Sequence, residues 1–183
     1  MPLTAIDENA ALVVIDLQRN IVGAFGVAAQ QTVANSAALA AEFRAAGRPV
    51  VLVNVATRPP GRTDAGAGTG VFSAEDIVVD ASLGSGADDL RVTKRAWGAF
   101  TNTDLDARLR ERGVTQVVMT GISTSIGVES TARSAYEHGY HVVLVEDAMT
   151  DSDPAAHERS LTTIFPRLGE VTNTAEVFAK LHG

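Results

Sequence analysis

Two charged residues have settings that suit chemistry. Asp16 directly follows the apolar run 11–15, where a carboxylate is poorly placed for solvation. Lys94 is one of only two lysines among the 15 basic residues of the chain. Lysine is a compact point charge whose pKa changes readily on burial. A capping or loop-starting aspartate and a surface lysine beside Arg95 are the alternative interpretations.

A third segment, residues 120–129, reads TGISTSIGVE and leads from an apolar run into a helical pattern. A helix N-terminus presents free N–H groups and the positive end of the helix dipole, which suits an anion. Gly127 falls near the first turn, where glycine costs about 1 kcal/mol against alanine. Its presence indicates close approach of a ligand to the backbone. For Thr124 and Ser125, a plain N-cap role is the alternative.

The elements that must position these residues alternate between strands and helices. Four apolar runs predict strands buried on both faces, as in a parallel sheet: 11–15, 50–53, 117–119 and 142–145. Helical patterns over 31–46, 102–112 and 124–138 stop at Gly47, Gly113 and Gly139, and Asp153-Pro154 opens another helix. The order predicts an α/β fold of three layers with right-handed crossovers. Ligands of such sheets bind at the carboxyl ends of the strands.

One long segment, residues 57–89, fits neither pattern. It is rich in Gly, Ala, Asp and Pro, and it includes Gly66 and Gly68. A loop of this length inside a compact domain is typical of a binding loop, a lid or a partly disordered segment.

Composition excludes several classes of protein. The 183 residues include no cysteine, which excludes disulfides, cysteine-ligated zinc, iron–sulfur clusters and a thiol nucleophile. A net charge of −7 argues against a nucleic-acid partner. No apolar run reaches the ~20 residues that span a membrane, and the N-terminus lacks a signal-peptide pattern. We therefore expect one cytoplasmic domain over residues 1–183.

Together these segments resemble the isochorismatase-like hydrolase superfamily, the cysteine hydrolase group. The resemblance covers nearly the whole chain, and it is carried by five stretches in order: 11–18, ALVVIDLQ; 94–100, KRAWGAF; 120–124, TGIST; 128–133, VESTAR; and Asp147-Ala148. It implies a Rossmann-like α/β/α fold with a parallel sheet, six-stranded and ordered 3-2-1-4-5-6. It also implies a homodimer or a larger homo-oligomer.

The resemblance further implies a catalytic Asp, Lys and Cys, and Asp16 and Lys94 match the first two. The family cysteine falls on Gly127, which has no side chain to substitute for it. A cis peptide would join Ile122 and Ser123, and an oxyanion hole would use the N–H groups of Ser123 and Gly127. The resemblance also implies five substrate-binding residues: Gln18, Trp97, Phe100, Ile122 and Ser123.

No metal or cofactor is expected. Nicotinamidases of this group use an Asp and a His-x-His cluster after the second strand, where this chain reads NVATR. The four histidines make no plausible site: His138, His141, His157 and His182. True isochorismatases resemble this pattern, with glycine in place of cysteine. They hydrolyse a vinyl ether without a nucleophilic side chain.

The sequence leaves three hypotheses open. The chain is a hydrolase that uses Asp16 and Lys94 for acid–base chemistry on a small molecule, with vinyl-ether hydrolysis as one possible reaction. A second hypothesis is a pseudoenzyme that binds a small molecule without turnover. A third is an amidohydrolase whose cysteine was replaced by Gly127, by engineering.

Overall fold

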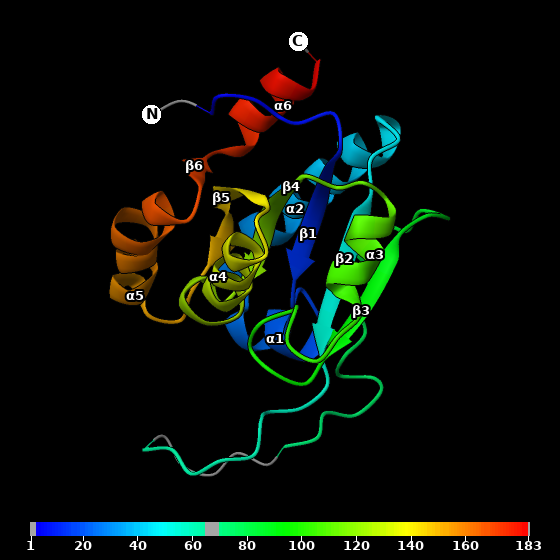
Figure 1. Cartoon of the computed structure of the whole chain (residues 1–183). Coiled ribbons are helices and arrows are strands. Elements are labelled where there is room, and N and C mark those ends of the chain that lie inside the picture. The colour runs from blue at the N-terminus through cyan, green and yellow to red at the C-terminus, as the bar shows by residue number, and fades with distance from the viewer. Residues whose placement is uncertain (1–2, 65–69, 183) are drawn as a thin grey trace.

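A six-stranded parallel sheet forms the centre of the molecule in the computed structural model, which describes residues 3–64 and 70–182 (Figure 1). Its strand order is β3-β2-β1-β4-β5-β6, as predicted. The strands are β1 (Ala10–Ile15), β2 (Val50–Val55), β3 (Leu90–Lys94), β4 (Gln116–Ile122), β5 (His141–Thr150) and β6 (Glu170–Thr172). Every residue of β1 and β4 is buried, which explains why these strands read as continuous apolar runs.

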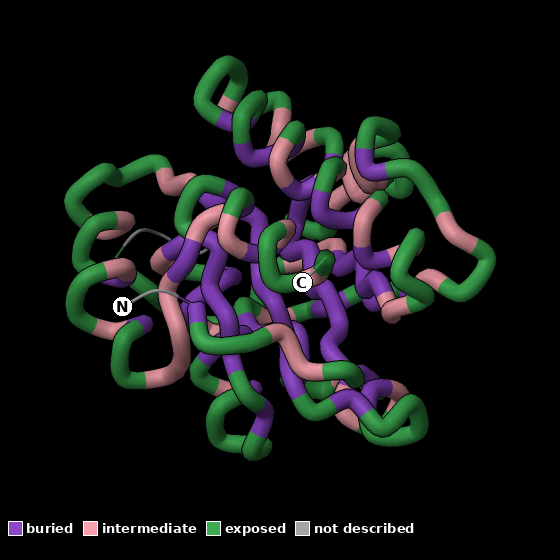
Figure 2. Tube along the Cα trace, turned by 90° about the horizontal axis from the view of Figure 1, so that it is seen from above, coloured by how far each residue is buried: buried purple, intermediate pink, exposed green. Residues whose placement is uncertain are grey.

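Helices cover both faces of the sheet. They are α1 (Arg19–Phe25), α2 (Val27–Ala45), α3 (Leu105–Glu111), α4 (Glu129–Glu137), α5 (Pro154–Arg159) and α6 (Thr174–His182). One face packs against α3 and α4, and the opposite face packs against α2 and α6 (Figure 1). Seen from above, the buried backbone runs through the middle of the molecule and exposed residues surround it (Figure 2). This is the three-layer arrangement that the sequence predicts.

Short helical turns complete the chain. They are the 3₁₀ turns η1 (Ala81–Leu83) and η4 (Phe165–Arg167) and the π-helical turns η2 (Thr124–Val128) and η3 (Ser160–Ile164). The helix predicted over 124–138 is therefore a π turn followed by α4. The helix predicted from Asn102 or Thr103 begins at Leu105, with Asp104 at the N-cap. Asp153 caps α5 by accepting a hydrogen bond from the Ala155 N–H at 2.9 Å, as predicted.

The long segment 57–89 leaves β2 at the carboxyl edge of the sheet, and its last residues reach the start of β3 at the opposite edge (Figure 1). Its Gly66 and Gly68 lie outside the described residues. The returning part is attached to the chain that follows β1, because Asp80 N–H donates to Leu17 O at 2.8 Å and Arg19 N–H donates to Val78 O at 2.9 Å. The segment thereby forms a wall beside the carboxyl end of β1.

Candidate functional site

A buried ion pair joins the ends of two strands. Asp16 directly follows β1, and Lys94 is the last residue of β3. Because β2 lies between these strands, their backbones are about 10 Å apart, and a long side chain is needed to span the gap. Lys94 Nζ lies 2.7 Å from Asp16 Oδ2. Asp16 is 4% exposed and Lys94 is 1% exposed, so the pair is nearly free of solvent.

Burial controls the protonation of Asp16. Removal from water raises the pKa of the Asp16 carboxyl to about 6, and this effect exceeds the lowering by the charge and hydrogen bond of Lys94. The second carboxylate oxygen, Oδ1, is buried and has no hydrogen-bond partner in the described part of the chain. An acid with these properties is half protonated near pH 6, keeps a minor protonated fraction at pH 7, and has an oxygen free to deliver the proton.

The lysine ammonium is held from two sides. Besides Asp16, Lys94 Nζ donates a hydrogen bond to the backbone carbonyl of Trp97. The carbonyl lies three residues along the chain, so the turn after β3 fixes where the ammonium points. Trp97 as a whole is 59% exposed, and its backbone carbonyl contacts the ion pair.

Gly127 lies against the same pair. It is buried within η2, after β4 and the cis peptide bond between Ile122 and Ser123. A Cβ atom at this position would lie 3.1 Å from Asp16 Oδ2 and 3.2 Å from Lys94 Nζ. The structure thus brings together the three residues that the sequence singled out from three segments. They meet beside β1, where the order of the strands reverses direction and sheets of this class bind ligands.

The hydroxyls near Gly127 have partners that the sequence did not suggest. Ser125 donates both its N–H, at 2.7 Å, and its hydroxyl, at 2.8 Å, to Asp151 Oδ2. Thr124 Oγ1 lies 2.8 Å from His157 Nδ1. These contacts span 26 and 33 residues, and no local pattern announces them. They fix η2 to the chain after β5 and to α5.

The remaining predicted site residues serve the fold around the pair. Gln18 is fully buried, and its side-chain amide accepts from Val55 N–H at 2.7 Å and donates to Val55 O at 3.1 Å. It therefore joins the chain after β1 to the end of β2. Ile122 is buried at 1% exposure. Ser123 is half-buried, and its carbonyl accepts the Val128 N–H at 3.1 Å.

Phe100 does not lie with these residues. Its ring packs 5.2 Å from His138 and 5.9 Å from Tyr140, measured between ring centroids, at the far end of α4 from Gly127. The chain after Trp97 runs along α4, where Ala99 N–H donates to Thr131 Oγ1 at 3.1 Å. This path carries the Phe100 ring into the core and away from Lys94.

No group of three or more His, Cys, Asp or Glu side chains in residues 3–64 and 70–182 could hold a metal ion. Within the same ranges, no helix has the length and apolar character needed to cross a membrane. The site itself presents a protonatable carboxyl, a fixed ammonium and the backbone of η2.

Comparison with known proteins places this geometry in context. Residues 10–176 match the model of the isochorismatase domain. The chain is 40% identical to the isochorismatase family protein YecD of Escherichia coli O157:H7 over 184 residues, covering 95% of this chain and 97% of YecD. An isochorismatase family protein from Burkholderia thailandensis has a solved structure with a TM-score of 0.92, 42% identity and coverage of 100% of this chain and 99% of that one. The N-carbamoylsarcosine amidase of Thermoplasma acidophilum is more distant, with a TM-score of 0.77, 27% identity and coverage of 91% and 96%.

Proposed function

The chain belongs to the isochorismatase family of hydrolases, and we propose that it works there without a nucleophilic cysteine, by acid–base chemistry of Asp16 and Lys94. The observation that carries the proposal is the buried pair beside Gly127, with Asp16 Oδ2 2.7 Å from Lys94 Nζ. The substrate class that we propose is a small vinyl ether. The proposed assembly is a homodimer or a larger homo-oligomer, to be measured by sedimentation at several protein concentrations.

Covalent catalysis through sulfur is not available to this chain. It contains no cysteine, and we assign the family's cysteine position to Gly127. A side chain there would touch both members of the ion pair, because its Cβ alone would lie 3.1 Å from Asp16 Oδ2 and 3.2 Å from Lys94 Nζ. The same position without a side chain leaves the carboxyl and the ammonium as the reactive groups.

The raised pKa of Asp16 suits the first step of vinyl-ether hydrolysis. With a pKa of about 6, roughly one carboxyl in ten carries its proton at pH 7, against fewer than one in a thousand at the ordinary value of 3.8. Asp16 donates this proton to the terminal carbon of the double bond, and an oxocarbenium ion forms. Water adds to that ion, and the hemiketal breaks to release an alcohol and a ketone, which is pyruvate when the substrate is isochorismate.

Lys94 and the backbone have supporting roles in this scheme. The ammonium stabilises the aspartate once its proton has left, and the Trp97 carbonyl keeps the ammonium in place. The N–H groups of Ser123 and Gly127 are the proposed donors to an anionic part of the substrate. Burial opposes Lys94 in setting the pKa of Asp16, and this balance leaves the acid weak enough to be protonated and strong enough to react.

The test supplies isochorismate and follows pyruvate with a coupled NADH assay. We expect release by the wild-type protein and a loss of at least about a hundredfold in Asp16→Asn, because general acid catalysis contributes that much. Asp88→Asn is the matched control, since Asp88 is exposed and lies at the other end of the sheet. Pyruvate release that does not exceed the Asp16→Asn level would remove isochorismate as the substrate.

A panel of ethers, amides and esters then separates the other hypotheses. Asp16-dependent turnover of any of these would keep the chain among the enzymes. Thermal stabilisation by a ligand without turnover would favour a binding protein. The likeness to an N-carbamoylsarcosine amidase motivates one more variant. Strong amidase activity in Gly127→Cys would favour an amidohydrolase whose cysteine was replaced.

A further inference from the structure

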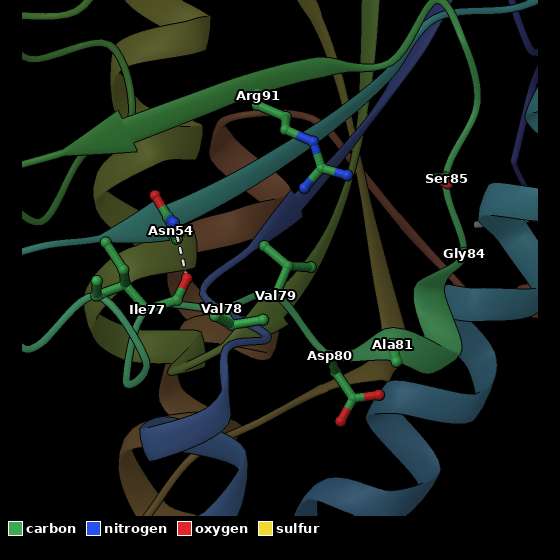
Figure 3. Close-up of a pocket in the computed structure, with 10 residues that line it drawn as sticks. Asn54, Ile77, Val78, Val79, Asp80, Ala81, Gly84, Ser85 and Arg91 are labelled. Carbon is green, nitrogen blue, oxygen red and sulfur yellow. Dashed lines mark hydrogen bonds between the residues drawn. The ribbon is translucent and has the colours of Figure 1, made fainter.

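A cavity lies away from the ion pair. It has a volume of about 530 Å³ and is bounded by β2, the edge strand β3 and the returning part of segment 57–89 (Figure 3). Leu90 and Val92 of β3 belong to the core on the α3 and α4 side, and Arg91, between them, faces the opposite side. Lys94 shares the side of Leu90 and Val92. The cavity and the ion pair are therefore on opposite faces of the sheet.

A cation lines this cavity without a protein partner. The guanidinium of Arg91 makes no hydrogen bond or ion pair within residues 3–64 and 70–182, and only its backbone carbonyl is used, by Arg108 Nη1 at 2.8 Å. Figure 3 shows the side chain extending from β3 toward the segment that carries Val79 and Asp80. Arginine binds carboxylates through two parallel N–H donors, so this group suits a ligand with a carboxylate.

Acceptors without protein donors line the same cavity. Asn54 donates from Nδ2 to Ile77 O at 2.8 Å, which fixes the orientation of its amide. Its Oδ1 atom is buried and has no hydrogen-bond partner in the described part of the chain. Asp80 Oδ1 accepts the Ser82 N–H at 2.9 Å, and Oδ2 has no partner there. An acceptor without a donor is unfavourable when it is buried, and a ligand with N–H groups can supply the missing donor.

The charges that line the cavity favour a ligand that carries both a positive and a negative charge. Asp80 would repel a simple carboxylate that approached Arg91, and Arg91 would repel a simple amine that approached Asp80. Ile77, Val78 and Val79 supply apolar surface between them. The volume lies within the range of small-ligand sites, at about 300–1,000 Å³.

The wall that carries these groups is held in place before a ligand arrives. Its main chain is bonded to residues 17–19 through Asp80 N–H and Val78 O. Asn54 anchors it to β2 through Ile77 O. Groups fixed in this way lose little conformational freedom on binding, which favours affinity.

We propose that this cavity is a binding site for a small amino acid in its zwitterionic form. Its carboxylate pairs with Arg91, and its ammonium donates to Asp80 Oδ2. The site is separate from the proposed acid–base centre and does not depend on the reaction assigned to Asp16.

The test uses ¹⁵N-labelled protein and amide NMR, with glycine, β-alanine and 4-aminobutyrate as probes of three charge spacings. Propionate and propylamine, each with one of the two charges, are the controls at matched ionic strength. We expect at least one amino acid to shift the amide signals of Val79, Ser85 and Arg91 more than either control does. The signals of Ser123 and Gly127 should stay unchanged. Absence of a shift with all three amino acids would overturn the proposal, and so would an equal response to propionate.

Two variants test the assigned contacts. Arg91→Gln should weaken binding about tenfold or more, because it removes a charge-assisted hydrogen bond. Asp80→Asn keeps an acceptor for Ser82 but removes the charge, so it should weaken amino-acid binding and improve binding of propionate. Arg167→Gln and Asp88→Asn are the matched controls, since both residues are exposed and lie outside the cavity. Unchanged binding in Arg91→Gln would refute the assigned site, provided that its amide spectrum shows a folded protein.

Discussion

The titration of Asp16 should appear directly in the stability of the protein. Its pKa is about 6 in the folded chain and 3.8 when the carboxyl is exposed. Each unit of difference corresponds to 1.36 kcal/mol, so the two values give about 3 kcal/mol. The perturbation that isolates this contribution is Asp16→Asn, which has a similar shape and does not titrate.

The direction of the pH dependence follows from whether the folded or the unfolded chain binds the proton of Asp16 more tightly. Between pH 3.8 and about 6 the folded protein holds a proton on Asp16 that the unfolded chain has released. The stabilisation from this residue is therefore fully present below pH 3.8 and is lost as the pH rises through about 6. We expect the free energy of unfolding of the wild type, relative to Asp16→Asn, to fall by about 2.5 kcal/mol from pH 4 to pH 8.

The assay is urea unfolding of both proteins at fixed concentration, at half-unit steps of pH. Asp16→Asn imitates the protonated carboxyl, which likewise carries no charge to pair with Lys94. The two proteins should therefore be most alike in stability near pH 4, and their difference should grow as Asp16 of the wild type loses its proton. A difference that does not vary with pH would refute the reasoning, because Asp16 would then titrate as an exposed carboxyl.

A second variant checks the cause of the shift. Lys94→Met removes the charge that lowers the pKa of Asp16 and leaves the burial that raises it. The pKa should therefore rise above 6, as measured from the ¹³C signal of the Asp16 carboxyl. A lower pKa in this variant would contradict the lowering effect assigned to Lys94.

Three further substitutions test the backbone around the pair. Gly127→Ala puts a methyl group 3.1 Å from Asp16 Oδ2. We expect pyruvate release to fall at least about tenfold because the methyl group crowds the acid. The free energy of unfolding in urea should change by no more than about 1 kcal/mol, since alanine favours helix. Gly121→Ala should destabilise the protein by more than about 3 kcal/mol, because the φ of Gly121 is +130° and the new Cβ would lie 2.1 Å from Ile15 O. A thermal unfolding midpoint close to that of the wild type would contradict this prediction. Thr131→Val removes the hydroxyl that donates to Gly127 O at 2.7 Å and should cost about 1–3 kcal/mol, with recovery in Thr131→Ser as the check.

The sequence predicts the sheet well because burial leaves a plain signal. Strands covered on both faces must be apolar throughout, and the runs at 11–15 and 117–119 correspond to β1 and β4. The helix α1 had no such signal. It contains no buried residue, so no periodic apolar face marks it. The apolar run 142–145 also underestimates the length of β5, because the strand continues past Val145 through two exposed residues, Glu146 and Asp147.

The site is predictable where topology alone brings residues together. Asp16, Lys94 and Gly127 follow or end three strands at one edge of the sheet, so their meeting depends only on strand order. Phe100 shows the limit of this reasoning. It lies six residues after Lys94, but its position depends on how the chain turns along α4. The contacts of Asp151 and His157 with η2 depend in the same way on distant packing.

The hydrogen bond from Lys94 to the Trp97 carbonyl gives the protein an optical reporter of its own. Trp97 is the only tryptophan in the chain, and the residue as a whole is exposed while its backbone carbonyl holds the ammonium. Fluorescence excited at the red edge of the protein absorption therefore comes from Trp97 alone. Quenching by a neutral solute and shifts of the emission maximum report whether a ligand covers the turn after β3. Binding and turnover at this end of the sheet are thus open to stopped-flow measurement without any label.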